Sequence, residues 1–423
     1  MDTEEVDLSA YAEIVASDDL GPEARKLFDH LTSRVIGQDR AARKIARGFA
    51  VHHAGLSEPN KPIGSFFFSG PTGWGKTEMA NQVGYYLIGD TPKPPVTSIQ
   101  CAFLKKDHEI SKIIGAPPGY VGYGQPYLLS QLKIDEPHFW AKIKPYMQEA
   151  FEDAGPDADP EEVLSMLYEE HKPYNSVIVF NEFEKAHTAL QEAMLHIVDE
   201  AVLQGGDGAE TSFQNSTIIL TCNVNGKQQQ DLIAGKDESV GFKSKDQRRK
   251  HVDEMSESER DELDNAIYTR TKHEIGKIFT PEFVGRFSEN IVVFRTLQRS
   301  QQMVILENML AKLRNRFTVA ANAKREDGKR CPIFFLTFSQ RFKEYVLHEG
   351  VNMRHGVRKL GAAVQRLATS PVANAILGGG ITDGDDVLVD FFEGKVQVRK
   401  RPVTKTIHQL PPPKIVGTPE KDE

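Results

Sequence analysis

The sequence has few cysteines and no long apolar run. Its three cysteines, Cys101, Cys222 and Cys331, are scattered over 423 residues. An odd and scattered set supplies neither a disulfide framework nor the paired spacing of a zinc site, so a reducing compartment is expected. No uninterrupted apolar stretch reaches the roughly 18 residues of a membrane-spanning helix. Because Met1–Asp7 is acidic and lacks the basic and apolar regions of a secretory or transit signal, we predict a cytoplasmic protein with no membrane partner.

Neither sign of charge dominates the chain. Lysine and arginine number 52 and aspartate and glutamate 60, which gives a formal net charge of −8 at pH 7. This mildly acidic total argues against a protein that coats nucleic acid, although a local basic patch is compatible with it. Hydrophobic residues at 39% and charged residues at 26% are typical of a globular protein, and the length allows two to three domains. We expect no nucleic-acid partner.

Short apolar runs alternate with helical patterns up to about residue 294. A helical pattern from Pro22 to about Ala54 is broken at 35–38, and a strand pattern follows at Gly64–Ser69. Four further apolar runs fit buried strands: Val96–Cys101, Ser176–Phe180, Thr217–Thr221 and Ile291–Phe294. Because short buried strands separated by helices favour parallel pairing, we predict an α/β fold with a mostly parallel sheet between helices.

The pattern changes past Phe294. Helical periodicity covers Gln298–Thr318, Phe338–His348 and Arg358–Ile376, and Asp386–Val398 resembles a terminal hairpin. These elements predict a small, mainly helical domain with a short terminal β element.

The predicted organisation has four parts. Residues 1–21 form an acidic leader, 22–297 a large α/β domain, 298–400 the small domain, and the Pro- and Lys-rich residues 401–423 a disordered tail.

Two stretches of the large domain look inserted. Residues 133–175 carry two helical patterns, of which the second opens with a cap at Asp159 and proline at the next position. The inserted residues either form an accessory recognition surface or are a tolerated surface insertion. Residues 243–264 mix both charges densely, as a solvated loop or an exposed helix does.

A phosphate-binding pattern stands between a predicted strand and a predicted helix. The run Gly70-Pro71-Thr72-Gly73-Trp74-Gly75-Lys76-Thr77 fits G-x-x-x-x-G-K-[ST]. Glycines let backbone N–H groups turn toward a phosphate, and the following helix presents its positive end. Lys76 would reach the β- and γ-phosphates and the Thr77 hydroxyl would bind Mg²⁺. A chance glycine-rich turn is the alternative, which the strand–loop–helix context disfavours.

An acidic strand end supplies the second half of such a site. The buried strand at 176–180 is followed by Asn181 and Glu182, whereas an aspartate would normally orient the Mg²⁺ shell at the first position. An amide accepts a hydrogen bond but brings no charge, so we expect weaker Mg²⁺ binding. Glu182 keeps a carboxylate that can polarise water. A strand end that merely caps the next helix is the alternative.

At this point the sequence resembles the Clp family of AAA+ protein unfoldases. Phe180–His187, with the letters FNEFEKAH, is similar to the Walker B segment of that family, and Ile113–Tyr123, IIGAPPGYVGY, resembles its substrate-gripping pore loop. Further similar segments occur in the family's order: Val35–Gln38, Thr221–Asn223, Phe279–Arg286 and Gly356–Leu360. The resemblance spans roughly residues 31 to 398 and implies a AAA+ nucleotide-binding domain followed by a lid domain.

The resemblance also implies roles for individual residues. Asn223 would help Glu182 orient the lytic water, Arg286 would act as an arginine finger toward the neighbouring subunit, and Arg358 would sense the γ-phosphate in its own subunit. The nucleotide would contact Val35, Ile36, Gly70, Pro71, Thr72, Gly73, Trp74, Gly75, Lys76, Thr77, Glu78 and Arg358, and Mg²⁺ would lie near Thr77 and Asn181.

The aromatic residue of the pore loop favours a protein thread as substrate. Tyr120 and Val121 lie between glycines, and an aromatic side chain on such a mobile loop is poorly satisfied by core packing alone. Partial burial of Tyr120 in the core is the alternative. A DNA-remodelling AAA+ loader would instead carry basic pore loops.

The family resemblance leads to a functional prediction with one alternative. We predict an ATP- and Mg²⁺-dependent unfoldase that threads unfolded or tagged proteins through a homohexameric pore. The alternative is a scaffold that binds ATP without useful hydrolysis, because of Asn181. Val240-Gly241-Phe242 resembles the tripeptide with which some members dock on a barrel peptidase, although an ordinary hydrophobic loop contact is equally compatible. Substrate selection would fall to the pore, to an inserted segment or to an adaptor.

Overall fold

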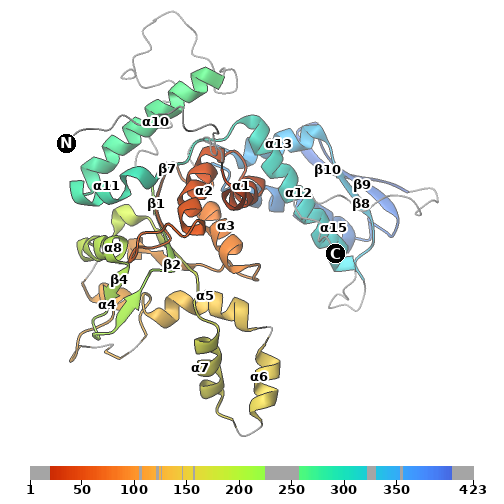
Figure 1. The fold of residues 1–423 in the computed structure, drawn as a ribbon. Coiled ribbons are helices and arrows are strands. Elements are labelled where there is room, and N and C mark those ends of the chain that lie inside the picture. The colour runs from red at the N-terminus through yellow and green to blue at the C-terminus, as the bar shows by residue number, and fades with distance from the viewer. Residues whose placement is uncertain are drawn as a thin grey trace, which may run out of the picture.

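The centre of the molecule is a parallel sheet, seen here in a computed structural model. The structure describes residues 20–103, 107–120, 123–124, 126–144, 146–155, 158–223, 257–321, 330–352 and 356–402. Five strands pair in the order β2-β3-β6-β1-β7, and every pairing is parallel (Figure 1). Their bounds are Gly64–Ser69 (β1), Thr97–Gln100 (β2), Ser176–Asn181 (β3), Ser216–Cys222 (β6) and Ile291–Val293 (β7). The predicted α/β fold is confirmed.

Side chains of β1 alternate between two helical layers, as the period of a strand requires. Phe66 and Phe68 share a buried cluster with residues of the first three helices. Phe67 lies in the cluster on the opposite face, with its ring centroid 6.3 Å from that of Phe283. The first layer consists of α1 (Pro22–Arg34), α2 (Asp39–His53) and α3 (Lys76–Ile88), and the second draws on α8 (Thr188–Glu200), α10 (Glu257–Ile278) and α11 (Pro281–Phe287). Helices on both faces explain why these strands are apolar along their whole length.

The carboxyl ends of the central strands meet at one edge of the sheet. The register pairs Gln100 with Asn181 and Ser69 with Cys222. Residues that follow these ends are therefore brought together from distant parts of the chain, which is where parallel α/β folds bind ligands.

Short elements connect the strands. Cys101–Phe103 (η2) and α4 (Asp107–Ile114) follow β2, and the 3₁₀ turn η3 (Phe183–Lys185) follows β3. An antiparallel hairpin of β4 (Val202–Gln204) and β5 (Glu210–Ser212) follows α8, and η5 (Ser288–Asn290) precedes β7. Of the charged segment 243–264, residues 257–264 open α10, and the rest lies outside the described residues.

The insertion forms a separate helical arm with its own small core (Figure 1). Its described residues form three helices rather than the two predicted: α5 (Gln131–Ile143), α6 (Met147–Ala154) and α7 (Pro160–Glu170). The prediction missed one helix because α6 has only eight residues, too few to establish a helical period. The predicted cap is present, since Asp159 accepts a hydrogen bond from the Glu161 N–H at 3.0 Å.

Buried polar groups fix this arm to the start of β3. The Asp135 carboxylate accepts hydrogen bonds from the Ser176 hydroxyl at 2.9 Å and from the Tyr168 hydroxyl at 2.8 Å. His138 Nδ1 accepts from the Asn175 backbone N–H, and burial lowers the pKa of this imidazole to about 4. His138 is therefore neutral at physiological pH, as an acceptor at Nδ1 requires.

The C-terminal part has a third apolar core of its own. Its helices are α12 (Arg299–Ala321), α13 (Gln340–Gly350), α14 (Leu360–Val364) and α15 (Ser370–Leu377), and a π-helical turn at Gln365–Thr369 joins the last two. Its sheet has the order β10-β9-β8, with β8 (Phe335–Phe338) parallel and β10 (Lys395–Pro402) antiparallel to β9 (Asp385–Phe392).

Two details of this part differ from the predictions. The hairpin is present, but β10 includes Arg401 and Pro402, which the sequence had assigned to the disordered tail. Residues 403–423 lie outside the described residues. Strand β8 was missed, because four residues that alternate between exposed and buried give too short a signal beside the helix that follows. Within the described ranges, no helix is both long and apolar enough to cross a membrane.

Candidate nucleotide-binding site

The phosphate loop lies between β1 and α3 and has the backbone that its glycines allow. Gly70, Gly73 and Gly75 have φ angles of 149°, 83° and 100°, a region that residues with a Cβ rarely adopt. A Cβ on Gly70 would lie 2.6 Å from the Phe294 carbonyl oxygen, so only glycine fits there. Helix α3 begins at Lys76, and the exposed Thr77 and Glu78 stand in its first turn. Loop and helix end together form a cradle suited to an anion.

Lys76 is buried inside this loop. Its ammonium group donates hydrogen bonds to the carbonyl oxygens of Gly70 at 2.5 Å and Pro71 at 2.9 Å, and to Asn223 Oδ1 at 3.0 Å. Burial lowers the pKa of Lys76 to about 8, and the nearby guanidinium of Arg358 acts in the same direction. No carboxylate is among the three groups that accept its hydrogen bonds. A phosphate would supply the missing negative charge.

Asn181 is buried at the end of β3 and hydrogen-bonded on both sides. Its Nδ2 donates to the Ser98 hydroxyl at 2.9 Å, and its Oδ1 accepts from the Thr221 hydroxyl at 3.3 Å. Thr221 Oγ1 in turn accepts from the Glu182 backbone N–H at 3.3 Å. The amide thus belongs to a chain of hydrogen bonds across β2, β3 and β6.

Glu182 has a strained backbone. Its φ and ψ of 55° and 48° are left-handed, which costs free energy in a residue other than glycine and is concentrated at functional sites. Its carboxylate forms an ion pair with Lys185 at 2.6 Å. The Thr221 hydrogen bond to its backbone helps to hold this conformation.

Asn223 connects the end of β6 to the phosphate loop. Its Oδ1 accepts from the Thr72 hydroxyl at 3.2 Å as well as from Lys76, and its Nδ2 donates to Glu184 Oε1 at 3.5 Å. The other oxygen of Glu184 is buried without a hydrogen-bond partner among the described residues. Sequence reasoning had not assigned Glu184 to the site, since its hydrogen-bond partner Asn223 is 39 residues away in the sequence, just after β6.

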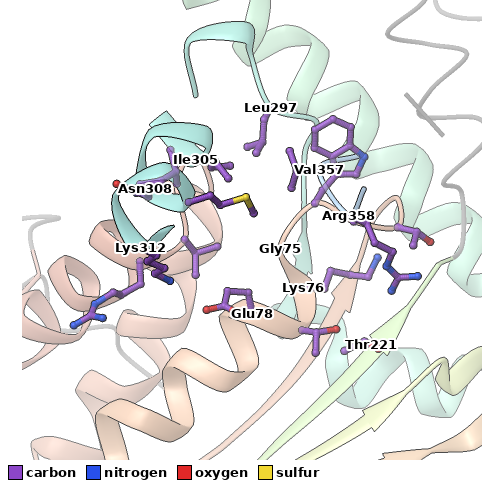
Figure 2. Close-up of a pocket in the computed structure, with 18 of the residues that line it drawn as sticks. Gly75, Lys76, Glu78, Thr221, Leu297, Ile305, Asn308, Lys312, Val357 and Arg358 are labelled. Carbon is purple, nitrogen blue, oxygen red and sulfur yellow. The ribbon is translucent and has the colours of Figure 1, made fainter. Parts of the chain in front are cut away.

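A cavity of about 1020 Å³ joins these groups to the C-terminal domain. Its apolar side is lined by Val35, Ile36, Leu297, Ile305 and Val357, and Figure 2 shows the last three around its upper part. The cavity is large enough for a nucleotide, with apolar groups at one end and the phosphate loop at the other. Sequence reasoning had missed the part of its lining that comes from α12, including Ile305, Asn308 and Lys312, because helical periodicity does not reveal which face meets the other domain.

The two arginines of the prediction occupy different places. Arg358 lines the cavity from the turn before α14, and Figure 2 shows its side chain beside Lys76. Arg286 lies in the last turn of α11, where its guanidinium pairs with Asp199 at 2.6 Å and with Glu282 at 3.7 Å. It does not line the cavity of its own chain.

Tyr120 and the other described residues of the predicted pore loop are not among those that line the cavity. Tyr120 is 71% exposed. The base of its loop is closed by hydrogen bonds from the N–H groups of Leu128 and Leu129 to the carbonyls of Lys112 and Ile113, both at 3.0 Å. Val121 and the predicted docking tripeptide Val240–Phe242 lie outside the described residues.

Comparisons with known proteins identify the family. An AAA domain (Cdc48 subfamily) model matches residues 61–138 and 161–290, and a model of the C-terminal, D2-small domain of ClpB protein matches residues 297–389. An ATP-dependent Clp protease ATP-binding subunit ClpA homolog from Porphyra purpurea is 31% identical over 380 residues, 89% of this chain. The chain belongs to the Clp family of AAA+ ATPases. The interruption of the first match falls within the helical arm.

This Clp-family chain spans little more than a third of its relatives. It covers 38% of the Porphyra protein and 34% of Chaperone protein ClpC1, chloroplastic, from Oryza sativa subsp. japonica, which is 30% identical over 383 residues, 90% of this chain. The name of the rice relative assigns that protein to the chloroplast, and a cytoplasmic location for this chain stays a prediction.

Proposed function

We propose that the chain is a subunit of a homohexameric ring that hydrolyses ATP with Mg²⁺ and uses the energy to unfold or remodel proteins. The observation that carries this proposal is the meeting of Lys76, Glu182, Asn223 and Arg358 around one cavity. Family membership supports it, and so does the exposed Tyr120 on its glycine-rich loop. Selection of protein rather than nucleic acid rests on the aromatic character of that loop.

The side chains around the cavity fit a nucleoside triphosphate with Mg²⁺. Among the described residues, no group of three or more His, Cys, Asp or Glu side chains could hold a metal alone. Mg²⁺ in nucleotide sites takes most of its ligands from phosphates and water, so the Thr77 hydroxyl and the strand end at Asn181 suffice. Bound Mg²⁺ would neutralise charge on the phosphates.

Two local rearrangements would prepare the protein for hydrolysis. A phosphate that binds Lys76 would release Asn223 Oδ1, which could then orient a water molecule. The Glu182 carboxylate would leave Lys185 and accept a hydrogen bond from the same water, increasing its nucleophilicity. Lys76 and Arg358 would stabilise negative charge on the γ-phosphate as it separates.

A non-hydrolysing scaffold is the second candidate, and the observation that favours it is Asn181. An uncharged strand end weakens the attraction for Mg²⁺, on which phosphoryl transfer depends. We favour hydrolysis because Lys76, Glu182, Asn223 and Arg358 line the same cavity, and Lys76 is hydrogen-bonded to Asn223.

The substitution Asn181→Asp should lower the Mg²⁺ concentration for half-maximal ATPase activity by about tenfold. A carboxylate can accept hydrogen bonds from both Ser98 and Thr221, so the local structure is retained. One negative charge about 4 Å from a doubly charged ion adds about 2 kcal/mol even in water, which exceeds the roughly 1.4 kcal/mol of a tenfold change. Asn181→Ala is the matched control, because it removes the hydrogen bonds without adding charge and should lower turnover. An unchanged Mg²⁺ dependence in Asn181→Asp would remove the reason for expecting slow turnover.

Threading by a ring is tested by two measurements on the same sample. We expect the mass of a hexamer in the presence of ATP, and an ATPase rate that an unfolded protein increases several-fold. Tyr120→Ala should keep the hexamer and the basal ATPase rate but lose the stimulation by unfolded protein. The reason is that the exposed tyrosine side chain would no longer contact the polypeptide in the pore. A monomer whose ATPase rate does not change when unfolded protein is added would contradict the proposal.

Docking on a Clp-type peptidase is a further part of the proposed function. The Porphyra relative is named as the ATP-binding subunit of a Clp protease, and Val240-Gly241-Phe242 resembles a docking tripeptide. A pull-down with a barrel peptidase should recover the chain, and replacement of Val240–Phe242 by alanines should abolish recovery. Equal recovery of both forms, or of neither, would exclude docking through this tripeptide.

A further inference from the structure

Trp74 is an unusual residue in the phosphate loop. The pattern G-x-x-x-x-G-K binds phosphate through backbone N–H groups and the lysine, so the side chain at this variable position has no part in that task. Yet the indole is only 1% exposed and is one of the largest fully buried side chains. In the part of the chain that the structure describes, Trp74 belongs to none of the four buried apolar clusters. Its burial needs another explanation.

The indole lies against the turn of the C-terminal domain that carries Arg358. A Cβ on Gly356 would stand 3.0 Å from Trp74 Cδ2 and 2.6 Å from the Gly73 carbonyl oxygen, and Gly356 has a φ of +56°. The same carbonyl accepts a hydrogen bond from the Val357 N–H at 3.2 Å. Only a glycine lets the turn approach this closely, and Arg358 follows two residues later.

The backbone of Trp74 is tied to the segment between the two domains. Gln38 Nε2 donates to the Trp74 carbonyl at 3.0 Å and to the Arg295 carbonyl at 2.8 Å. Gln38 Oε1 accepts from the Arg295 N–H at 3.3 Å. Arg295 stands between β7 and α12, where the chain passes from the α/β domain to the C-terminal one. The phosphate loop, the segment that connects the two domains and the turn that carries Arg358 therefore meet at Trp74.

The indole N–H is buried without a hydrogen-bond partner among the described residues. An unpaired buried donor destabilises the arrangement that contains it, and phenylalanine would fill similar space without that cost. The arrangement is thus one that a change in the phosphate loop can readily shift.

We propose that Trp74 is a positioning residue that transmits occupancy of the phosphate loop to the C-terminal domain by seating the Gly356–Arg358 turn. The inference rests on the proposed nucleotide site. When phosphate displaces the hydrogen bonds of the loop, the indole moves with the backbone, and the turn that rests on it carries Arg358 to a new place. Phosphate binding itself does not require the ring.

The chain has two tryptophans, which makes the inference measurable by fluorescence. Trp140, the other one, is 43% exposed on α5 in the helical arm, so Trp140→Phe leaves Trp74 as the single reporter. In that background we expect ADP and a slowly hydrolysed ATP analogue to change the Trp74 emission. We also expect them to alter hydrogen exchange of the backbone amides in 356–364. Neither readout needs turnover, so they hold even where the ATPase proposal fails.

Two substitutions separate the ring from the rest of the loop. Trp74→Val should lower kcat by about tenfold, a larger factor than any loss of nucleotide affinity, and abolish the nucleotide-dependent exchange at 356–364. Trp74→Phe, which keeps a ring, should retain a larger share of both kcat and the exchange difference. Trp74 emission that does not change when nucleotide binds would overturn the inference. So would a Trp74→Val protein whose exchange at 356–364 still responds, or one that loses nucleotide affinity as strongly as kcat.

Discussion

Replacing Glu182 with glutamine should lower ATP turnover by about two to three orders of magnitude and leave ATP binding intact. Glutamine has nearly the same shape, so the left-handed backbone and its hydrogen bond to Thr221 are retained. It cannot polarise the attacking water as a carboxylate does, while the phosphate loop and Lys76 are unaffected. Steady-state phosphate release and equilibrium binding of a fluorescent nucleotide measure the two quantities.

The matched control is Lys185→Ala. It removes the ion pair of Glu182 but not the carboxylate, and should therefore keep turnover or raise it, since the carboxylate no longer has to leave its partner. The pair is solvent-exposed, so its loss changes the free energy of unfolding by no more than about 1 kcal/mol. Equal turnover in Glu182→Gln and in the parent protein, with ATP still bound, would contradict hydrolysis at this site and favour the scaffold.

Local patterns in the sequence were sufficient to predict the centre of the fold. Each central strand is an apolar run bounded by polar or glycine residues, and burial on both faces of the sheet makes such runs continuous. The phosphate loop was equally visible, because its function depends on residues that are neighbours in the chain. Both are properties of one segment at a time.

Pairings between segments could not be predicted in the same way. The departure at Asn181 was visible, but its hydrogen bonds to Ser98 and Thr221 depend on the order of β2, β3 and β6 in the sheet. The sequence places Trp74 only among the nucleotide contacts, whereas its contact with the Gly356 turn depends on how the two domains pack. The site is thus predictable where sequence neighbours form it and unpredictable where strand order and domain packing do.

The pairing of Arg286 with Asp199, 87 residues apart, leads to the second large prediction. Arg286→Ala should lower turnover by about three orders of magnitude, the usual range for an arginine that stabilises the transition state of phosphoryl transfer. Because Arg286 is absent from the cavity of its own chain, it can meet a γ-phosphate only across a subunit interface. The ion pair with Asp199 engages Nε at 2.6 Å, and the longer pair with Glu282 engages one Nη atom at 3.7 Å, so the two carboxylates orient the guanidinium.

Asp199→Ala is the control for stability. It breaks the same ion pair but keeps the arginine, so it should retain far more turnover than Arg286→Ala. Both groups are about one-third or more exposed, and such an exposed pair contributes little to folding, because water and salt screen it. If the two variants lost activity equally, the role of Arg286 would be structural.

Mixed rings test whether Arg286 acts across the interface. Glu182→Gln subunits keep the arginine and Arg286→Ala subunits keep the carboxylate, and each should be inactive alone. In a mixture, a site whose carboxylate comes from one variant and whose arginine comes from its neighbour is complete, so part of the parent turnover should return. A mixture that exchanges subunits, shown by labelled chains, and still lacks turnover would mean that both residues act within one chain. Recovery of turnover would support both the ring assembly and the action of Arg286 on the site of the neighbouring subunit, because neither variant can supply a complete site by itself.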